Sequence, residues 1–202
     1  MSRLRHKGAR NDVFFKKARE QGFAARAVHK LEDLDKKLAL LRAGDRVLDL
    51  GCRPGSWLQY AAKRVGPHGK LVGIDRLPMP AEIPGARIVL GDLYETPDEV
   101  LLADVGAFDV VLSDMAPDTT GIKATDQARS AQLFEEALNR AERMLAPGGA
   151  FVGKIFQGPD MEALRKRMQK LFGVVKLVKP EASRKDSTEI YLAGKVFIPL
   201  AT

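Results

Sequence analysis

Short apolar runs alternate with longer segments of helical periodicity along most of this chain. The apolar runs predict seven β-strands, over residues 46–50, 70–75, 87–91, 108–114, 150–156, 174–178 and 189–196. The segments between them predict helices over residues 56–65, 97–104, 126–145 and 160–172. Strands that alternate with helices are typical of an α/β fold, in which helices cover both faces of a mostly parallel sheet. Only residues 179–188 separate the last two strands, too few for a crossover helix, so these strands are predicted to be antiparallel.

The residues before the first strand predict two helices. Asp12 is a candidate cap for a short helix that runs to about Gln21, and Gly22 is expected to end it. A longer helix is predicted over residues 24–41, where apolar residues recur at helical spacing. Lys30 lies at the edge of that apolar face, where a lysine usually extends its ammonium group to solvent. The chain is therefore expected to comprise a basic N-terminal extension, residues 1–23, and one α/β domain, residues 24–202.

A glycine-rich turn follows the first predicted strand and opens a helix, in the stretch V-L-D-L-G-C-R-P-G-S-W at residues 47–57. Such a turn brings backbone N–H groups close to a ligand. Asp75 ends the next strand, 24 residues after Gly51, where nucleotide-binding sheets carry an acid that accepts hydrogen bonds from a ribose diol. Gly51 and Gly55 depart from G-x-G-x-x-G, the spacing that cradles a pyrophosphate. The pattern therefore favours S-adenosylmethionine over NAD as the ligand.

Charged residues also stand at or inside three later predicted strands. Asp114 ends the strand over residues 108–114, in the middle of the sheet, where open α/β sheets bind ligands, although an acid there can also simply cap a turn. Lys154 lies within an apolar strand, a place that rarely holds an unpaired lysine. Glu189 begins the last strand. With Lys30, they form two acids and two bases that can offset one another's burial in one pocket.

Composition and charge narrow the class of protein. The 202 residues fit one domain, and the single cysteine, Cys52, excludes a disulfide framework and favours a reducing compartment. The charged N-terminus and the lack of a long apolar run predict a cytoplasmic protein without a signal peptide or membrane span. Residues 1–30 carry nine Lys and Arg against two acids, and residues 151–202 carry ten against five. Two basic ends predict a surface for a polyanion such as nucleic acid.

Several motifs together resemble one known family. The stretches S-D-M-A-P, L-A-P-G-G, K-x-F-Q-G and K-P-x-x-S-R begin at residues 113, 145, 154 and 179. With the glycine-rich turn, they make nearly the whole chain similar to the FtsJ/RrmJ (RlmE) family of ribosomal RNA 2′-O-ribose methyltransferases. The resemblance implies a Rossmann-like S-adenosylmethionine-dependent methyltransferase fold, a seven-stranded, mostly parallel sheet with an antiparallel last strand. It also implies methylation of a uridine ribose in 23S ribosomal RNA of the large ribosomal subunit.

The resemblance implies roles for individual residues. The family's Lys-Asp-Lys-Glu tetrad falls on Lys30, Asp114, Lys154 and Glu189. Its S-adenosylmethionine contacts fall on Gly51, Pro54, Gly55, Trp57, Asp75, Asp92 and Asp114. No metal is expected. The basic segments add candidate RNA-binding residues, namely Arg3, Arg5, Lys7, Arg10, Lys16, Lys17, Arg26, Lys179, Arg184 and Lys185.

In the implied reaction, Lys154 handles the 2′-hydroxyl, either as a neutral base or by orienting the oxygen lone pair. Asp114 orients Lys154, and Glu189 steadies Lys30 or Lys154. The chain departs from the family pattern in two places. Arg53 and Ser56 stand within the turn that the family usually writes A-P-G-G-W, and Asp118 replaces its usual Asn.

Other functions are compatible with parts of this pattern. The same tetrad serves 2′-O-methyltransferases that act on a messenger cap or on transfer RNA. A catalytically inactive RNA-binding assembly factor is the alternative of another class, and Arg53 and Ser56 favour it. A small-molecule methyltransferase would leave both basic ends without a role. The compact chain favours ribosomal RNA, where the ribosome itself supplies specificity, and a monomer is expected.

Overall fold

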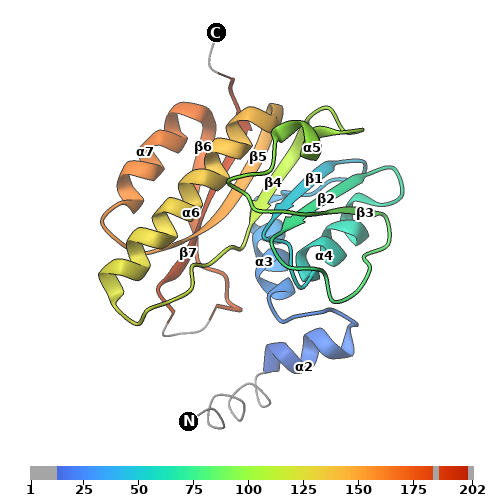
Figure 1. Ribbon diagram of the computed structural model, residues 1–202, viewed down its shortest axis with the longest axis horizontal. Coiled ribbons are helices and arrows are strands. Elements are labelled where there is room, and N and C mark those ends of the chain that lie inside the picture. Colours follow the sequence, from blue (N-terminus) through green and yellow to red (C-terminus); the bar gives the residue numbers. More distant parts are fainter. Residues whose placement is uncertain (1–12, 184–186, 200–202) are drawn as a thin grey trace.

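The computed structural model of the protein describes residues 13–183 and 187–199. At its centre lies a seven-stranded sheet with the strand order β3-β2-β1-β4-β5-β7-β6 (Figure 1). The strands are β1 (Arg46–Leu50), β2 (Lys70–Asp75), β3 (Ala86–Leu90), β4 (Phe108–Ser113), β5 (Leu145–Phe156), β6 (Phe172–Val178) and β7 (Glu189–Phe197). The first five strands are parallel, whereas β7 runs antiparallel to both β5 and β6. The predicted α/β class and the reversed last strand are confirmed.

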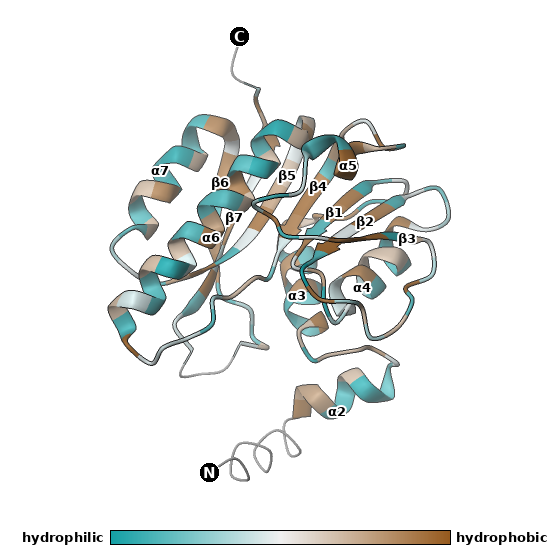
Figure 2. Ribbon diagram, in the orientation of Figure 1, coloured by the Kyte–Doolittle hydropathy of each residue, from teal (hydrophilic) through white to brown (hydrophobic). Residues whose placement is uncertain are grey.

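Helices cover both faces of this sheet. The described helices are α2 (Val13–Glu20), α3 (Val28–Leu38), α4 (Ser56–Val65), α5 (Asp98–Leu102), α6 (Lys123–Met144) and α7 (Met161–Leu171). Buried residues of α3 and α4 pack on one face, and those of α5, α6 and α7 pack on the other. Apolar strands lie between helices whose outer sides are polar, as Figure 2 shows. The sheet is thus the middle of three layers, and α2 lies outside them, next to α3.

Alternating side chains along the strands fill one core on each face of the sheet. On β1, Val47 packs with α3 and α4, whereas Leu48 and Leu50 pack on the side of α6. Asp49 lies between these two leucines and is only 2% exposed, and its Oδ2 has no hydrogen-bond partner among the described residues. Successive residues of a strand face opposite sides of the sheet, and both sides are buried here. The strands therefore appear in the sequence as continuous apolar runs.

The helix predicted over residues 24–41 is shorter than expected at both ends, because α3 begins at Val28 and ends at Leu38. Ala39 adopts a left-handed conformation with φ of 49°. The Asp35 carboxylate accepts hydrogen bonds from the Leu40 and Leu41 N–H groups, at 3.0 and 2.9 Å. This buried acid turns the chain after α3, so Leu41 packs in the core from outside the helix. The helical spacing continues past the point where the helix stops.

Other boundaries differ by up to five residues, and the largest difference is in the strand predicted over residues 150–156, which begins at Leu145. The short predicted helix forms as α2 and Gly22 follows it with φ of 76°, while its predicted cap, Asp12, lies outside the described residues. The helix predicted from residue 126 begins at Lys123, because the Asp126 carboxylate receives the Thr120 and Gly121 N–H groups and closes the entry loop. The strand predicted to end at Asp114 ends one residue earlier, so Asp114 belongs to the loop that follows.

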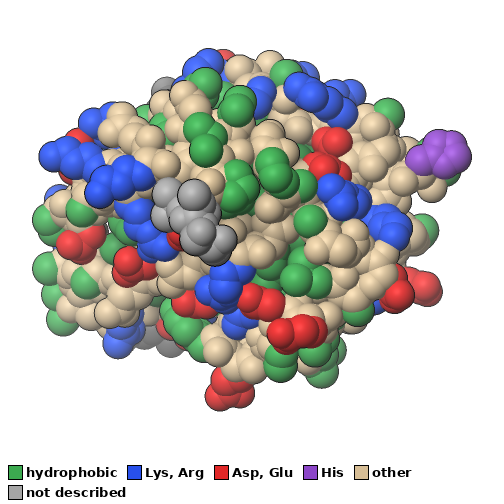
Figure 3. All heavy atoms as spheres, turned by 90° about the horizontal axis from the view of Figure 1, so that it is seen from above, with side chains coloured by type: hydrophobic (Ala, Val, Ile, Leu, Met, Phe, Trp, Pro, Cys, Tyr) green, Lys and Arg blue, Asp and Glu red, His purple; other side chains and the backbone are tan. Residues whose placement is uncertain are grey.

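The predicted reactive residues lie together at the carboxyl-terminal end of the parallel strands. The parallel strands β1 to β5 end there, and the reversed β7 begins there, since Glu189 pairs with Phe156. The opposite end of the molecule carries acidic, basic and apolar side chains intermixed (Figure 3). Within the part of the chain that the structure describes, no helix has the length and apolar character needed to cross a bilayer.

Candidate active site

The four charged residues predicted from the sequence meet in one cluster. The Lys30 ammonium group lies 2.7 Å from Glu189 Oε1 and 3.8 Å from Asp114 Oδ1. The Lys154 ammonium group lies 2.9 Å from the same Asp114 oxygen and donates to the Asp114 backbone carbonyl at 2.6 Å. Both lysines are only 8% exposed. Each buried cation therefore has a carboxylate partner, as burial of charge requires.

The strand register explains how these residues meet. Lys154 on β5 lies directly opposite Tyr191 on β7, and Glu189 lies two residues before Tyr191. Opposed residues of an antiparallel pair, and residues two apart on one strand, project from the same face. Helix α3 packs on that face and brings Lys30 from its first turn. The loop after β4 then supplies Asp114 beside β5.

Tyr191 is a member of this cluster that sequence analysis missed. Its hydroxyl donates to Asp114 Oδ1 at 2.5 Å, and its ring lies 5.9 Å from the Lys30 ammonium group. Burial, and then the neighbouring Asp114 carboxylate, raise the pKa of Tyr191 well above its usual value, so the phenol stays protonated and donates. The two-residue period from Glu189 could have placed Tyr191 on the same face. An aromatic residue in a strand is more often part of the core.

Glu189 is the second carboxylate of the cluster. Burial by itself raises the pKa of Glu189, but its ion pair with Lys30, together with smaller contributions such as the nearby Lys154 charge, outweighs this effect, and the pKa lies below its usual value of 4.5. Glu189 is therefore ionised at neutral pH and holds Lys30. The Asp114 carboxylate contacts Lys154, Lys30 and the Tyr191 hydroxyl, whereas Glu189 pairs with Lys30 alone among the described salt bridges.

A cavity of about 540 Å³ opens beyond the ends of β1, β2, β3 and β4. Four of the predicted cofactor-binding residues line it, namely Gly51, Asp75, Asp92 and Asp114. Gly51 has φ of 74°, and a Cβ there would lie 2.3 Å from Met115 Cγ. Glycine therefore permits both the turn and the close approach of the Met115 side chain. The cavity has the volume of a small-molecule site and lies where open α/β sheets bind ligands.

Asp75 presents its carboxylate to this cavity in a fixed orientation. Its Oδ2 accepts from the Arg53 N–H at 3.0 Å, and its Oδ1 accepts from the Leu77 N–H at 2.9 Å. Each carboxylate oxygen has a second acceptor position, so Asp75 can still receive two hydroxyl groups. These residues therefore fit the ribose diol of a nucleoside ligand.

The departures from the family pattern lie around the same cavity. The Arg53 guanidinium group donates to the Pro78 carbonyl at 3.2 Å, which holds this charge at the rim. Ser56 is 2% exposed and is not among the lining residues. Asp118 lies at the mouth of the cavity, where it pairs with Arg76 at 3.3 Å. None of the three substitutions closes the cavity.

The remaining predicted cofactor-binding residues, Pro54, Gly55 and Trp57, lie outside the lining of this cavity. Gly55 is the N-cap residue just before α4, with φ of 103°. The Trp57 indole donates to the Ala27 carbonyl at 2.8 Å, and its ring lies 6.0 Å from the Tyr191 ring. Trp57 therefore supports α3 and Tyr191 from within the core, and its contact with a cofactor stays a prediction.

A second cavity, of about 420 Å³, adjoins the first, because Ala116 lines both. Lys154 and Glu189 line this second cavity, together with Gln127 from α6 and Thr188. Asp114 faces the first cavity, so the charged cluster stands between the two. Over residues 13–183 and 187–199, no cluster of His, Cys, Asp and Glu is arranged to hold a metal ion.

The structure describes some of the predicted RNA-binding residues. Lys16 and Lys17 are exposed on α2, and Lys179, exposed after β6, donates to the Ser187 carbonyl at 3.1 Å. Arg26 is half-buried just before α3. Six others fall outside the described residues, namely Arg3, Arg5, Lys7, Arg10, Arg184 and Lys185. Their role stays a prediction.

The pair of Glu189 and Lys30 generates a prediction about acid stability. A carboxyl group whose pKa is lower in the folded state stabilises the fold above its unfolded pKa, and this contribution disappears as the pH falls through the folded value. We therefore expect Glu189→Gln to destabilise the protein more at pH 7 than at pH 3. Urea unfolding at a series of pH values measures the difference. A difference that is constant from pH 7 to pH 3 would contradict the role of this ion pair.

Comparison with known proteins agrees with this geometry. The FtsJ-like methyltransferase family matches residues 23–197. A protein of Sorangium cellulosum, named ribosomal RNA large subunit methyltransferase E, is 50% identical over 92% of this chain and 87% of its own length. A protein of the same name from Desulfatibacillum aliphaticivorans is 48% identical over 96% of this chain and 94% of its own.

Among solved structures, one described as a ribosomal RNA methyltransferase from Plasmodium falciparum is 28% identical. It superposes with a TM-score of 0.77 and covers 88% of this chain and 100% of the other. The matched family spans the sheet, both cavities and all four members of the charged cluster. The chain therefore belongs to the FtsJ-like methyltransferase family.

Proposed function

We propose that this protein transfers a methyl group from S-adenosylmethionine to the 2′-oxygen of a uridine ribose in 23S ribosomal RNA. The observation that carries the proposal is the cluster of Lys30, Asp114, Lys154 and Glu189, which stands between two adjoining cavities. Family membership supports the reaction type. The names of the relatives support the large ribosomal subunit as the source of the substrate.

The first cavity is the proposed donor site. Asp75 would receive the ribose hydroxyls, and Asp92 would face the adenine side. Bound S-adenosylmethionine supplies a methyl group on a sulfonium, which is already activated for transfer. The residues at the Asp114 end of the cavity therefore need only bring the acceptor oxygen into line and manage its proton.

The second cavity is the proposed acceptor site, and Lys154 is the residue that meets the acceptor. Two of its ammonium hydrogens are used by the Asp114 carboxylate and the Asp114 carbonyl, which leaves the third for a ligand. As a cation, Lys154 orients the lone pair of the 2′-oxygen. As a neutral amine, it accepts the hydroxyl proton. Lys30 pairs mainly with Glu189 and does not contact the acceptor in this proposal. It affects Lys154 through Asp114, which lies near both lysines.

The basic extension, residues 1–23, is proposed to bind RNA next to the methyltransferase domain, residues 24–202. Helix α2 supports this assignment, because its exposed Lys16 and Lys17 accompany the exposed Phe15. Aromatic side chains beside basic ones are typical of RNA-binding surfaces. We further propose that the protein acts as a cytoplasmic monomer, with the ribosomal particle as its partner.

The donor site generates the first prediction of the proposed function. Asp75→Ala removes the proposed acceptor of the ribose hydroxyls, so calorimetry should show S-adenosylmethionine binding weakened by about 1–3 kcal/mol. Asp118→Ala is the matched control, because Asp118 lines the same cavity but its side chain is 90% exposed. The control should bind within about 0.5 kcal/mol of the parent. Parental affinity in Asp75→Ala would place the donor elsewhere.

The second prediction concerns Lys154, because it separates an enzyme from a binding protein. Lys154→Met keeps the apolar stem and removes the amine. It should fold and bind both S-adenosylmethionine and RNA, but transfer methyl groups roughly 10²–10⁴-fold more slowly. Lys176→Met on the exposed edge strand β6 is the matched control, with parental activity expected. A methylation assay on ribosomal particles decides, and near-parental activity in Lys154→Met removes this residue from the mechanism.

The RNA surface generates the third prediction. Phosphate contacts release counterions, so RNA affinity should fall steeply with salt, and Lys16→Glu with Lys17→Glu should reduce the slope by roughly one for each lost contact. Deleting residues 1–11 should also weaken RNA binding and spare S-adenosylmethionine binding. The matched control is Lys166→Glu with Lys170→Glu, which reverses the charge of two lysines that are exposed on α7. Affinity that does not change with salt argues against this surface.

A further inference from the structure

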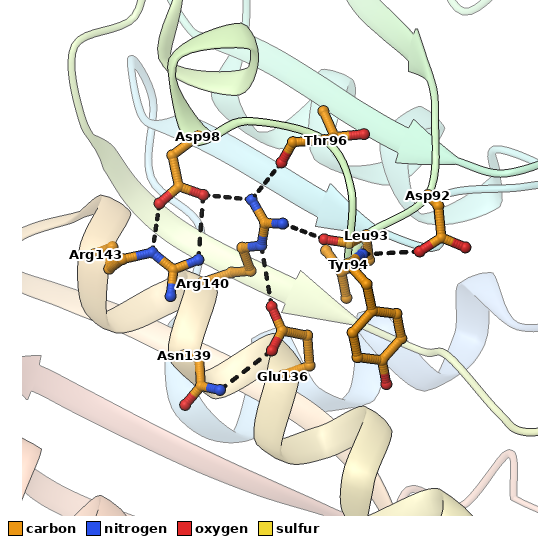
Figure 4. Close-up of polar contacts among 9 residues, drawn as sticks. All are labelled: Asp92, Leu93, Tyr94, Thr96, Asp98, Glu136, Asn139, Arg140 and Arg143. Carbon is orange, nitrogen blue, oxygen red and sulfur yellow. Dashed lines mark hydrogen bonds and ion pairs between the residues drawn. The ribbon is translucent and has the colours of Figure 1, made fainter.

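A buried arginine holds the loop that forms one wall of the first cavity. This loop, residues 91–97, joins β3 to α5, and its Gly91, Asp92, Leu93 and Tyr94 line the cavity. Arg140 on α6 is only 4% exposed. Its guanidinium group donates to the Leu93 carbonyl and, at 2.7 Å, to the Thr96 carbonyl (Figure 4). Helix α6 thus fixes the loop through its backbone.

Carboxylates hold this guanidinium group in place. Its Nε donates to Glu136 at 3.2 Å, and its Nη1 pairs with Asp98 at the start of α5. Arg143 also pairs with Asp98, and Asn139 donates to Glu136 at 3.2 Å (Figure 4). The planar fork of arginine can serve several acceptors at once, which the ammonium group of lysine cannot match in geometry.

The loop transmits this position to the cavity. The Thr96 N–H donates to the Asp92 carbonyl at 2.9 Å, and the Tyr94 N–H donates to the Asp92 carboxylate at 2.8 Å. The Gly91 N–H donates to the Asp75 carbonyl at 3.0 Å. A shift of the carbonyls that Arg140 holds would therefore move Asp92 and the backbone around it.

The strand order shows which part of a donor this wall would meet. The charged cluster lies at β4, β5 and β7, whereas the loop follows β3 at the other edge of the sheet, beyond β2 and Asp75. A donor whose transferable group lies at the cluster and whose ribose lies at Asp75 therefore has its adenine at the loop. Helix α6, which carries Arg140, also lines the first cavity directly with Gln132 and Leu133, two turns before Arg140.

We propose that Arg140 is a positioning residue for the adenosine half of the methyl donor. By fixing the loop between β3 and α5, it shapes the wall of the cavity that this half of the donor would contact. This inference rests on the proposed function, because it needs an adenosine-containing donor. It predicts that loss of the guanidinium group affects donor binding and leaves the transfer step unchanged. It also predicts that the effect is confined to the adenosine half.

The test compares Arg140→Met, Arg140→Lys and the parent. Arg140→Met should bind S-adenosylmethionine roughly tenfold to a hundredfold more weakly, because buried carbonyls lose a charged donor. The KM for the donor should rise by the same factor, with kcat at saturating donor within about twofold of the parent. 5′-Methylthioadenosine, which keeps the adenosine half, should lose affinity equally. Arg140→Lys should lose less affinity than Arg140→Met.

Arg143→Met is the matched control. Arg143 shares Asp98 with Arg140 but is 49% exposed, and its described hydrogen bonds reach Asp98 rather than the loop carbonyls. The control should bind the donor as the parent does. An equal loss in this control, or parental donor affinity in Arg140→Met, overturns the inference. So does a fall in kcat at unchanged KM, or failure of both Arg140 variants to fold at 25 °C. A parent that does not bind S-adenosylmethionine instead overturns the proposed function.

Discussion

One oxygen atom, Asp114 Oδ1, connects the charged residues of this site. The Tyr191 hydroxyl lies 2.5 Å from it, the Lys154 ammonium group 2.9 Å and the Lys30 ammonium group 3.8 Å. Two buried ammonium groups are stable only with such partners, because an unpaired buried charge is strongly destabilising. The reversed β7 makes the arrangement possible, since it places Glu189 and Tyr191 at the carboxyl-terminal end of the parallel strands. The reversed strand therefore supplies a partner that the buried lysines require, so the topology of the sheet and the charge balance of the site depend on each other.

Helix α6 gives the two cavities a common wall. Its first turns contribute Lys123 and Gln127 to the second cavity, and its middle contributes Gln132 to the first. Further along, Arg140 fixes the loop after β3. This helix of 22 residues packs against both β4 and β5. The proposed donor and acceptor sites therefore share this helix as part of their lining.

Sequence analysis predicted the α/β class and the reversed strand because these follow from local periodicity and from the length of one connection. It placed the end of α3 too late because Leu41 continues the helical spacing. The hydrogen bonds from the Leu40 and Leu41 N–H groups to the Asp35 carboxylate end the helix earlier. The four charged residues were predicted from their places in the predicted strands and helix, the family resemblance then assigned them the roles of a tetrad, and the strand register explains their geometry. Tyr191 and Arg140 were missed because their partners are distant in sequence, 77 residues away for Tyr191. Before folding, each resembles an ordinary core or surface residue.

The geometry favours an enzyme over a protein that only binds RNA. A buried cluster of two cations and two anions is weak as a source of stability, since well-packed apolar residues commonly replace such clusters without loss. An RNA-binding surface needs exposed basic residues, and Lys30 and Lys154 are buried instead. The substitutions that favoured an inactive protein leave the site intact, because Arg53 is held at the rim by Pro78 and Ser56 lies outside the cavity lining. A charged cluster that opens onto two cavities is suited to chemistry between two bound molecules.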